Sequence, residues 1–168
     1  MEHINIKIFA EGQADVAAAI PVLHRWIQDR VCPELAIDVA DYSHVPAGPG
    51  VILVTHEANY SLDAARGRLG LLYNRKAPLT GTPVERLRHC WDAALWACQR
   101  LEQESEFKGK LTFNPNEAEV ILNDRRAFPN TEETWQALRG DIGQFFAGYA
   151  LTRSSDPRDR FRVHARKT

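Results

Sequence analysis

The segment from Thr82 to Leu101 carries the strongest signal for local structure in this chain. Thr82 can accept a hydrogen bond from the backbone N–H of Glu85, the Glu85 side chain can return one, and Pro83 fits the first helical position. Apolar residues then recur at spacings of three and four, which places them on one face of a helix. They are Val84, Leu87, Trp91, Ala94, Cys98 and Leu101. A helix with such a face must pack against an apolar surface that the rest of the chain supplies.

Short segments in which apolar and polar residues alternate can provide that surface. Alternation is typical of a strand with one buried face, and Ile4, Ile6 and Ile8 against Asn5 and Lys7 are the clearest case. A longer segment, residues 51–63, forms a hairpin with residues 69–76 if it continues as one strand and turns at residues 66–68. The remaining predicted strands are residues 35–40, 110–113, 119–122 and 160–166.

Two further segments have helical spacing. The first runs from Val16 to Val31 and tolerates Pro21 in its first turn, and the second runs from Trp135 to Tyr149. The predicted order is β-α-β-β-β-α-β-β-α-β, with no composition break or repeat. We therefore expect one α+β domain over residues 1–168, with a mostly antiparallel sheet of six to seven strands and about three helices on one face.

Composition narrows the class of protein. The chain has 168 residues, of which 44% are hydrophobic and 26% charged, a balance typical of globular domains. A net charge of −1 argues against general nucleic-acid binding. No segment reaches the roughly 18 apolar residues of a membrane span, and the N-terminus does not resemble a signal peptide. The three cysteines contain no CxxC pair and fit buried thiols in a reducing compartment. We expect a soluble, cytoplasmic protein.

The sequence lacks the common catalytic and cofactor motifs. It contains no GxxxxGK[ST], GxGxxG or GxSxG pattern. His56-Glu57 begins a zinc-protease-like pattern that fails because position 60 is tyrosine. Asp38, Asp41 and His44 offer metal-ligand chemistry, but Asp41 better fits a turn. We therefore expect no metal and no cofactor, and we assign no enzyme class.

The predicted strand over residues 51–63 holds the first candidate site. One of its faces would carry His56 and Tyr60, which could act as an acid/base pair or bind a ligand. The other face would carry Glu57, Asn59 and Asp63, and this polar row could line a ligand groove because it contains no Lys or Arg. The alternatives are a histidine held in the core and an ordinary solvent-facing strand.

The C-terminal segment is the second candidate. From Arg153 onward the chain carries six Lys or Arg residues against two Asp. On one face of the predicted last strand lie Arg160, Arg162, His164 and Arg166. These side chains could attract phosphate, an acidic partner or single-stranded nucleic acid. The alternative is an edge strand whose charges prevent aggregation.

Two tryptophans provide a third candidate. Trp26 and Trp96 fall beside the apolar stripes of their helices, so they could anchor a protein interface, or they could be buried against the sheet. The sequence favours a non-catalytic binding or protein-interaction domain, expected to be a homo-oligomer. The first alternative is a small ligand-binding protein or enzyme with its pocket at the hairpin. A weaker alternative is phosphate or nucleic-acid binding at the basic strand.

Overall fold

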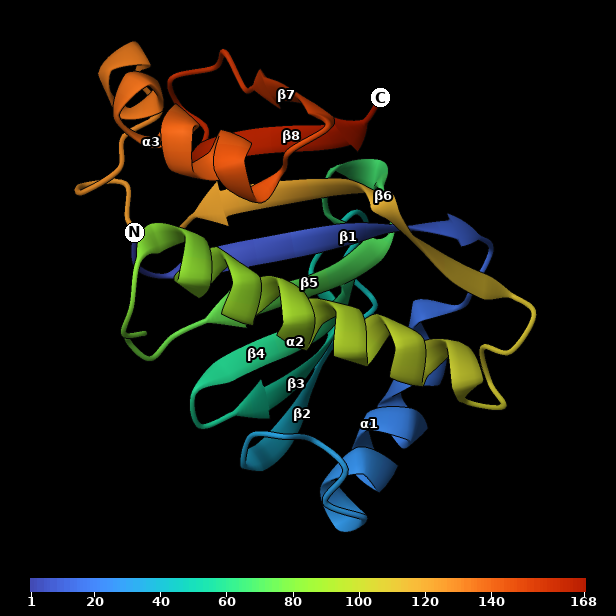
Figure 1. Ribbon diagram of the computed structural model, residues 1–168. Helices are drawn as coiled ribbons and strands as arrows, with labels where there is room; N and C mark the ends of the chain where they lie inside the picture. The colour runs from blue at the N-terminus through green and yellow to red at the C-terminus, as the bar shows by residue number, and fades with distance from the viewer.

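The computed structural model describes residues 1–168 and has the predicted α+β class. Eight strands form one antiparallel sheet in the order β2-β3-β4-β5-β1-β6-β8-β7 (Figure 1). The strands are β1 (Ile4–Gly12), β2 (Ala36–Tyr42), β3 (Gly50–Thr55), β4 (Ala58–Asp63), β5 (Gly70–Arg75), β6 (Leu111–Leu122), β7 (Tyr149–Arg153) and β8 (Phe161–Lys167). The helices are α1 (Ala19–Gln28), α2 (Pro83–Gln103) and α3 (Glu132–Phe145), with short 3₁₀ turns at Val16–Ala18 (η1) and Ala65–Gly67 (η2).

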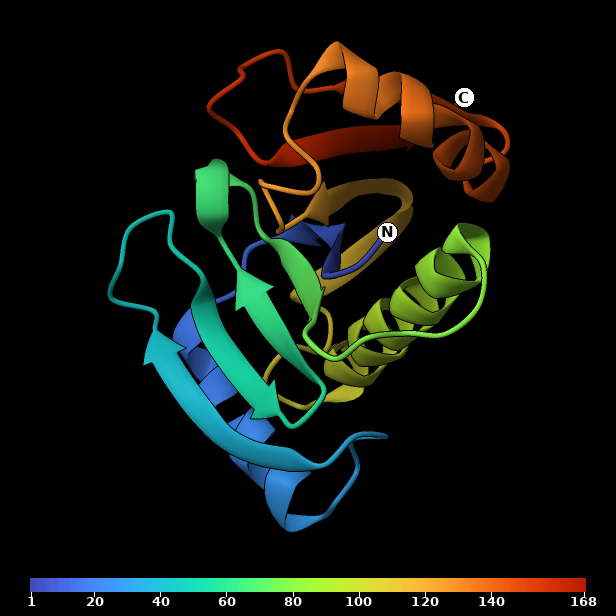
Figure 2. The ribbon, with the colours of Figure 1, turned by 90° about the vertical axis from the view of Figure 1, so that its left-hand side faces the viewer.

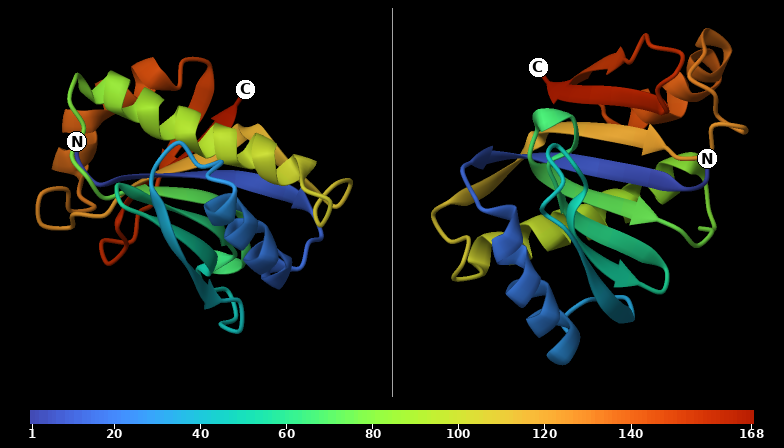
Figure 3. Two further views of the ribbon diagram at one scale, coloured as in Figure 1. Left: turned by 90° about the horizontal axis from the view of Figure 1, so that it is seen from below. Right: turned by 180° about the vertical axis from the view of Figure 1, so that it is seen from behind.

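The three helices lie on one side of the sheet, and the other side has no helix (Figure 3). α2 crosses β1, β5 and β6, whereas α1 covers β2 and β3. The sheet is strongly twisted, so that β2 runs at a steep angle to β8 (Figure 2). We call the uncovered side the open face.

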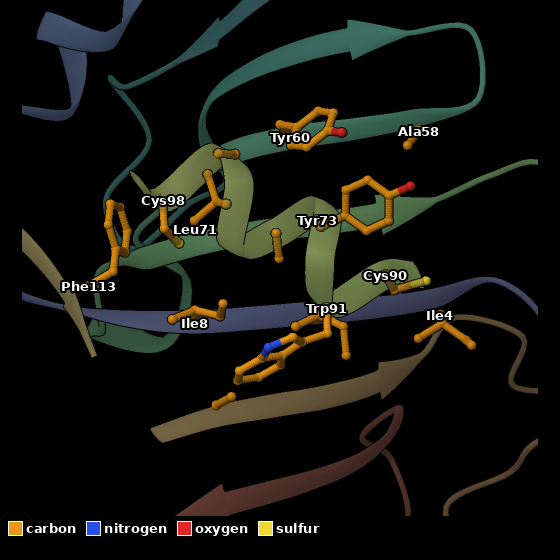
Figure 4. Close-up of a cluster of buried hydrophobic side chains, with 14 of the residues drawn as sticks. Ile4, Ile8, Ala58, Tyr60, Leu71, Tyr73, Cys90, Trp91, Cys98 and Phe113 are labelled. Carbon is orange, nitrogen blue, oxygen red and sulfur yellow. The ribbon is translucent and has the colours of Figure 1, made fainter. Parts of the chain in front are cut away.

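The central strand, β1, divides its side chains between the two faces. Ile4, Ile6 and Ile8 are buried beneath α2. Figure 4 shows Ile4 and Ile8 among the other apolar side chains of this core. Asn5 and Lys7 point to the open face and are also buried, at 1% and 3% exposure. β1 therefore needs a different set of partners on each face.

The strongest predicted helix is confirmed with its cap. Thr82 and Glu85 form both bonds of the capping box, Pro83 opens α2, and the helix continues for 21 residues. Its apolar face packs on the sheet, and Trp91 contacts Phe145 and Phe146 edge-on at 5.9 and 5.6 Å between ring centroids. These contacts attach the end of α3 to the same core.

The prediction of one strand over residues 51–63 is wrong. β3 and β4 are separate strands joined by a two-residue turn at His56-Glu57. The Thr55 hydroxyl closes the turn, since it accepts from the Ala58 N–H at 3.0 Å and donates to the Ala58 carbonyl at 2.8 Å. The turn contains neither glycine nor proline, so its composition gave no signal.

Two other elements differ from the prediction. Residues 111–122 form one strand, because Pro115 lies in a stretch of β6 that pairs with neither β1 nor β8 and so breaks no ladder bond. The last predicted helix ends at Phe145, and Gly148 then adopts φ +83°. Glycine adopts this left-handed conformation easily and commonly ends helices. Tyr149 therefore begins β7 instead of extending α3.

An ion pair buried in the open face joins β1 to β4. Lys7 Nζ lies 2.5 Å from Asp63 Oδ1, and both side chains are 4% exposed. The same ammonium donates to the carbonyls of Arg68 at 2.6 Å and Ala65 at 3.3 Å. All three of its protons therefore have acceptors, and the β4–β5 connection is fixed against the sheet.

We expect Asp63→Ala to lower the free energy of unfolding by about 3–5 kcal/mol, because it leaves the Lys7 ammonium buried without its counter-ion. Urea unfolding at neutral pH measures this loss. The exposed Asp29 at the end of α1 provides the matched control, and Asp29→Ala should change stability by no more than about 0.5 kcal/mol. Equal effects of the two substitutions would contradict a structural role for the pair.

Candidate functional site

The open face holds a cavity of about 360 Å³, which we call the open-face pocket. Its floor combines three asparagines with three apolar side chains from five adjacent strands. The strand register places Asn74 opposite both Asn5 and Asn59, and Ile121 opposite Asn5. The floor residues are Asn5, Ile52, Asn59, Ser61, Leu72, Asn74 and Ile121.

Loops and the end of the sheet form the pocket walls. Ala47 to Pro49, in the β2–β3 loop, line one side, and η2 lines another. A hydrogen bond of 3.1 Å from the Ala64 N–H to the Gly48 carbonyl joins these two segments. The right-hand view of Figure 3 looks onto this side of the molecule, with α2 behind the sheet.

Positive charge predominates around the open-face pocket. Lys7, Arg66, Arg160 and Arg162 line it, against the single carboxylate of Asp63. Lys7 is neutralised by Asp63, Arg66 pairs with Asp159 at 2.9 Å, and Arg162 pairs with Glu119. Arg160 forms no ion pair, and its guanidinium donates only to the Asn123 side chain, at 3.0 Å. A neighbouring polar cavity of about 330 Å³ shares Arg66 and Arg162 and extends the cationic region.

A network of amides holds one side of the pocket in place. Asn5 and Asn123 exchange two side-chain hydrogen bonds, of 3.1 and 3.0 Å. Asn123 also donates to Asn74 Oδ1 at 3.3 Å. Because Arg160 donates to the same Asn123, its guanidinium is oriented by the network. Two floor amides and one wall cation are thus fixed before any ligand binds.

Unpartnered polar atoms mark the pocket more sharply than charge does. Three buried side-chain polar atoms in the molecule have no hydrogen-bond partner: Asn59 Oδ1, Arg162 Nε and the Tyr60 hydroxyl. Asn59 and Arg162 both line the open-face pocket. Buried polar atoms normally have a partner, so each exception requires an explanation. Here one acceptor and one donor belong to residues that line the same cavity.

The hairpin residues predicted as one site are divided between two faces. Asn59 and Asp63 reach the open-face pocket, whereas Glu57 and Tyr60 line a different cavity on the helix side. His56 is exposed in the turn and lines neither. Alternation along β4 causes the division, because neighbouring strand residues point to opposite faces. The expectation that His56 and Tyr60 share one face of a strand is wrong, since it depended on an uninterrupted strand over residues 51–63.

The basic C-terminal residues also separate. Arg160 and Arg162 line the open-face pocket, while Arg166 is exposed beyond it. β8 is not an edge strand, because β7 pairs with its outer side. Protection of a sheet edge therefore does not explain its charges. Sequence analysis identified the polar row and the basic row separately but could not show that they meet across β5, β1 and β6.

Of the two candidate interface tryptophans, Trp26 has no free surface. It is 2% exposed, donates from Nε1 to Glu104 at 2.7 Å, and packs against Trp96 at 5.4 Å between ring centroids. Of the two alternatives for Trp26, an interface anchor or a buried residue, the structure shows the buried one. Trp96 is half-buried and lines the helix-side cavity beside Tyr60.

The remaining candidates have structural roles. Asp41 accepts a hydrogen bond from the Ser43 N–H at 2.8 Å, as a turn residue does. No group of three or more His, Cys, Asp or Glu side chains is placed to hold a metal ion. All three cysteines are free, and burial raises the pKa of Cys32 to about 11 and that of Cys90 to about 12. These thiols are therefore protonated and unreactive at neutral pH.

Glu117 lies at the end of the open face and contacts the side chains of Arg68 and His164. Its carboxylate accepts from Arg68 at 2.9 Å and contacts His164 Nε2 at 2.8 Å. The Arg68 hydrogen bond, followed by that of His164, lowers the pKa of Glu117 to about 2. A carboxyl whose pKa is lower in the folded state stabilises the fold above its unfolded pKa, and this contribution is lost as pH falls through the folded pKa.

We expect Glu117→Gln to be less stable than the wild type at pH 7. The difference should shrink as pH falls from about 4.5, the ordinary pKa of a glutamate, toward about 2. Urea unfolding of both proteins across this range measures the effect. A difference that is independent of pH would show that the loss comes from packing and not from the carboxylate charge.

Comparisons with known protein families, with curated proteins and with solved structures found no match. None of the three helices is both long enough and apolar enough to cross a membrane.

Proposed function

We propose that this protein is a non-catalytic binding domain whose open-face pocket takes a small organic anion. The observation that carries the proposal is the buried, unpartnered Nε of Arg162, in a cavity lined by four cations of which Arg160 has no counter-ion. A guanidinium matches the geometry of carboxylate and phosphate groups. An anionic group bound there would supply the acceptor that Arg162 Nε lacks.

The pocket floor indicates what else the ligand carries. Ile52, Leu72 and Ile121 provide apolar contact, and the Asn59 carbonyl oxygen needs a donor. A cavity of about 360 Å³ falls within the range of small-molecule sites. A carboxylate or phosphate attached to a compact body with N–H or O–H groups satisfies all of these conditions.

The chemistry around the pocket favours binding over reaction. Lys7 and Asp63 are bonded to each other, and no histidine or cysteine lines the cavity. Ser61 is the one hydroxyl residue of the lining, and its only hydrogen bond is a long one of 3.5 Å to the Leu72 carbonyl. A serine nucleophile requires an adjacent base, which Ser61 does not have.

Isothermal titration with citrate and with adenosine 5′-monophosphate tests the proposal. We expect at least one of these anions to bind, and Arg162→Met to weaken it about tenfold or more, because a hydrogen bond to a charged group is lost. Arg160→Gln should also weaken binding without disturbing an ion pair. Arg158 is the matched control, since its side chain is 90% exposed in the neighbouring loop.

Two results would contradict the proposal that the open-face pocket binds an anion. If neither anion binds the wild type, or if Arg158→Gln weakens binding as much as Arg160→Gln does, the pocket is not an anion site. Urea unfolding of Arg162→Met separates lost binding from lost folding, because this substitution leaves Glu119 without its partner.

Self-association remains a second candidate, and edge strand β2 favours it. β2 has one unpaired edge, and Leu35 and Ile37 beside it are 73% and 56% exposed. An edge strand with exposed apolar side chains can pair with another strand. The occupant we infer is β2 of a second copy, related by a twofold axis that would continue the sheet across both subunits.

We expect the double substitution Leu35→Lys and Ile37→Lys to abolish a dimer. Each subunit would then bring two positive charges to the paired β2 edges, and these charges would repel one another. Native mass spectrometry and light scattering over a concentration series measure the change. Gln144→Lys on α3 adds a charge at an exposed position far along the chain and should leave the dimer intact. A wild-type protein that is monomeric throughout the series would exclude this candidate.

A further inference from the structure

The helix side holds a second cavity, of about 440 Å³, beside the exposed flank of α2. We call it the helix-side pocket. Glu57 reaches it from the β3–β4 turn, Glu34 from the segment before β2, and Tyr60 from β4. Its main lining side chains are Glu34, Glu57, Tyr60, His89, Asp92 and Trp96.

Carboxylates predominate in this cavity. Glu34, Glu57 and Asp92 line it, and no lysine or arginine does. The nearest cation in contact with them is Arg75, which lies behind the pocket at 6% exposure and bonds Glu57 at 2.9 Å and Glu34 at 3.5 Å. One guanidinium cannot neutralise three carboxylates, and Asp92 forms no ion pair. The helix-side pocket therefore has the opposite charge to the open-face pocket.

Tyr60 provides a second and independent indication of a ligand. The residue is 1% exposed and lines the cavity, and its hydroxyl has no hydrogen-bond partner. Its neighbour Tyr73 donates to Glu34 at 2.9 Å, so the two tyrosines differ in this respect. Figure 4 shows both hydroxyls pointing toward the same end of β4 and β5.

The missing partner of Tyr60 is best supplied by an N–H donor. Glu34 accepts from Tyr73 at 2.9 Å and from Arg75 at 3.5 Å, and its charge also acts on the Tyr60 hydroxyl. Burial, followed by the charge of Glu34, raises the pKa of Tyr60, so the hydroxyl keeps its proton. Its oxygen retains free lone pairs that can accept a hydrogen bond.

We propose that the helix-side pocket binds a primary ammonium group carried on a short aliphatic chain. Tyr60 would accept one N–H, and the carboxylates of Glu57 and Asp92 would balance the charge. The Trp96 ring and Ala93 offer surface for the aliphatic chain, and an aromatic ring also attracts a cation. This site lies on the opposite face from the open-face pocket and does not depend on the function proposed there.

A primary ammonium fits better than a quaternary one or a metal ion. A quaternary ammonium has no N–H and would leave the Tyr60 oxygen without a partner. The carboxylates are too dispersed for a metal ion, because no three potential ligands approach one another closely enough. The combination of an unpartnered acceptor with surrounding negative charge therefore selects a cation that donates hydrogen bonds.

The test compares n-butylamine with tetramethylammonium, which has the charge but no N–H. Titration followed by tryptophan fluorescence and calorimetry should show that the wild type binds n-butylamine more tightly. Tyr60→Phe should weaken n-butylamine binding about fivefold or more and leave tetramethylammonium binding unchanged, because only the hydroxyl is removed. Asp92→Asn should weaken the binding of both cations.

Measurements of stability separate a role of Tyr60 in binding from a role in folding. The Tyr60 hydroxyl makes no close hydrogen bond within the protein, so Tyr60→Phe should leave the free energy of unfolding nearly unchanged. Tyr42→Phe, at a 44% exposed tyrosine on β2, is the matched control. Arg162→Met should leave amine binding unchanged, which makes failure here distinguishable from failure of the anion proposal.

A third probe identifies the source of the ammonium group. N-acetyl-lysine N-methylamide carries the same group on a peptide unit. Tighter binding of this probe than of n-butylamine would support recognition of a lysine side chain, and weaker binding would support a free amine. Equal affinity of the wild type and Tyr60→Phe for both primary amines, or no ammonium binding at all, would overturn the proposal.

Discussion

A lysine ammonium buried on the central strand sets the conditions that the open face must meet. Lys7 is 3% exposed, and a charge in that position is tolerated only with a counter-ion and acceptors for its protons. Asp63 and the carbonyls of Ala65 and Arg68 meet this need. In doing so they bring the β4–β5 connection over the sheet, where Ala65 and Arg66 become a wall of the open-face pocket. The pocket is thus a consequence of how one charge is neutralised.

β4 links the two pockets through the alternation of its side chains. Asn59 faces one cavity and the next residue, Tyr60, faces the other. Both carry a buried polar atom without a partner, but their surroundings have opposite charge. One strand thereby contributes to a cavity lined mainly by cationic side chains and to a cavity lined mainly by acidic ones. The sheet keeps the open-face pocket and the helix-side pocket apart on its two faces and supplies lining residues to both.

Local patterns predicted the elements well and the pockets only in part. The capping box at Thr82 and the alternation in β1 and β8 depend on neighbouring residues, so the sequence was sufficient for them. The turn at His56 was missed because it contains no typical turn residue. Its stability comes instead from the two hydrogen bonds of the Thr55 hydroxyl. Strand order arises from pairing between distant segments, which no local pattern reports. Asn5 and Asn74 were therefore not recognised as pocket residues.

The central place of β1 also affects how the chain is made. β1 precedes both of its sheet neighbours, β5 and β6, in the chain, and β6 ends only at Leu122. At translation rates of about 5–20 residues per second, the edge of this isoleucine-rich strand that pairs with β6 stays unpaired for on the order of ten seconds. A nascent chain with such an exposed strand is prone to pair with other chains. Efficient production of this protein should therefore depend on a chaperone that shields β1 during synthesis.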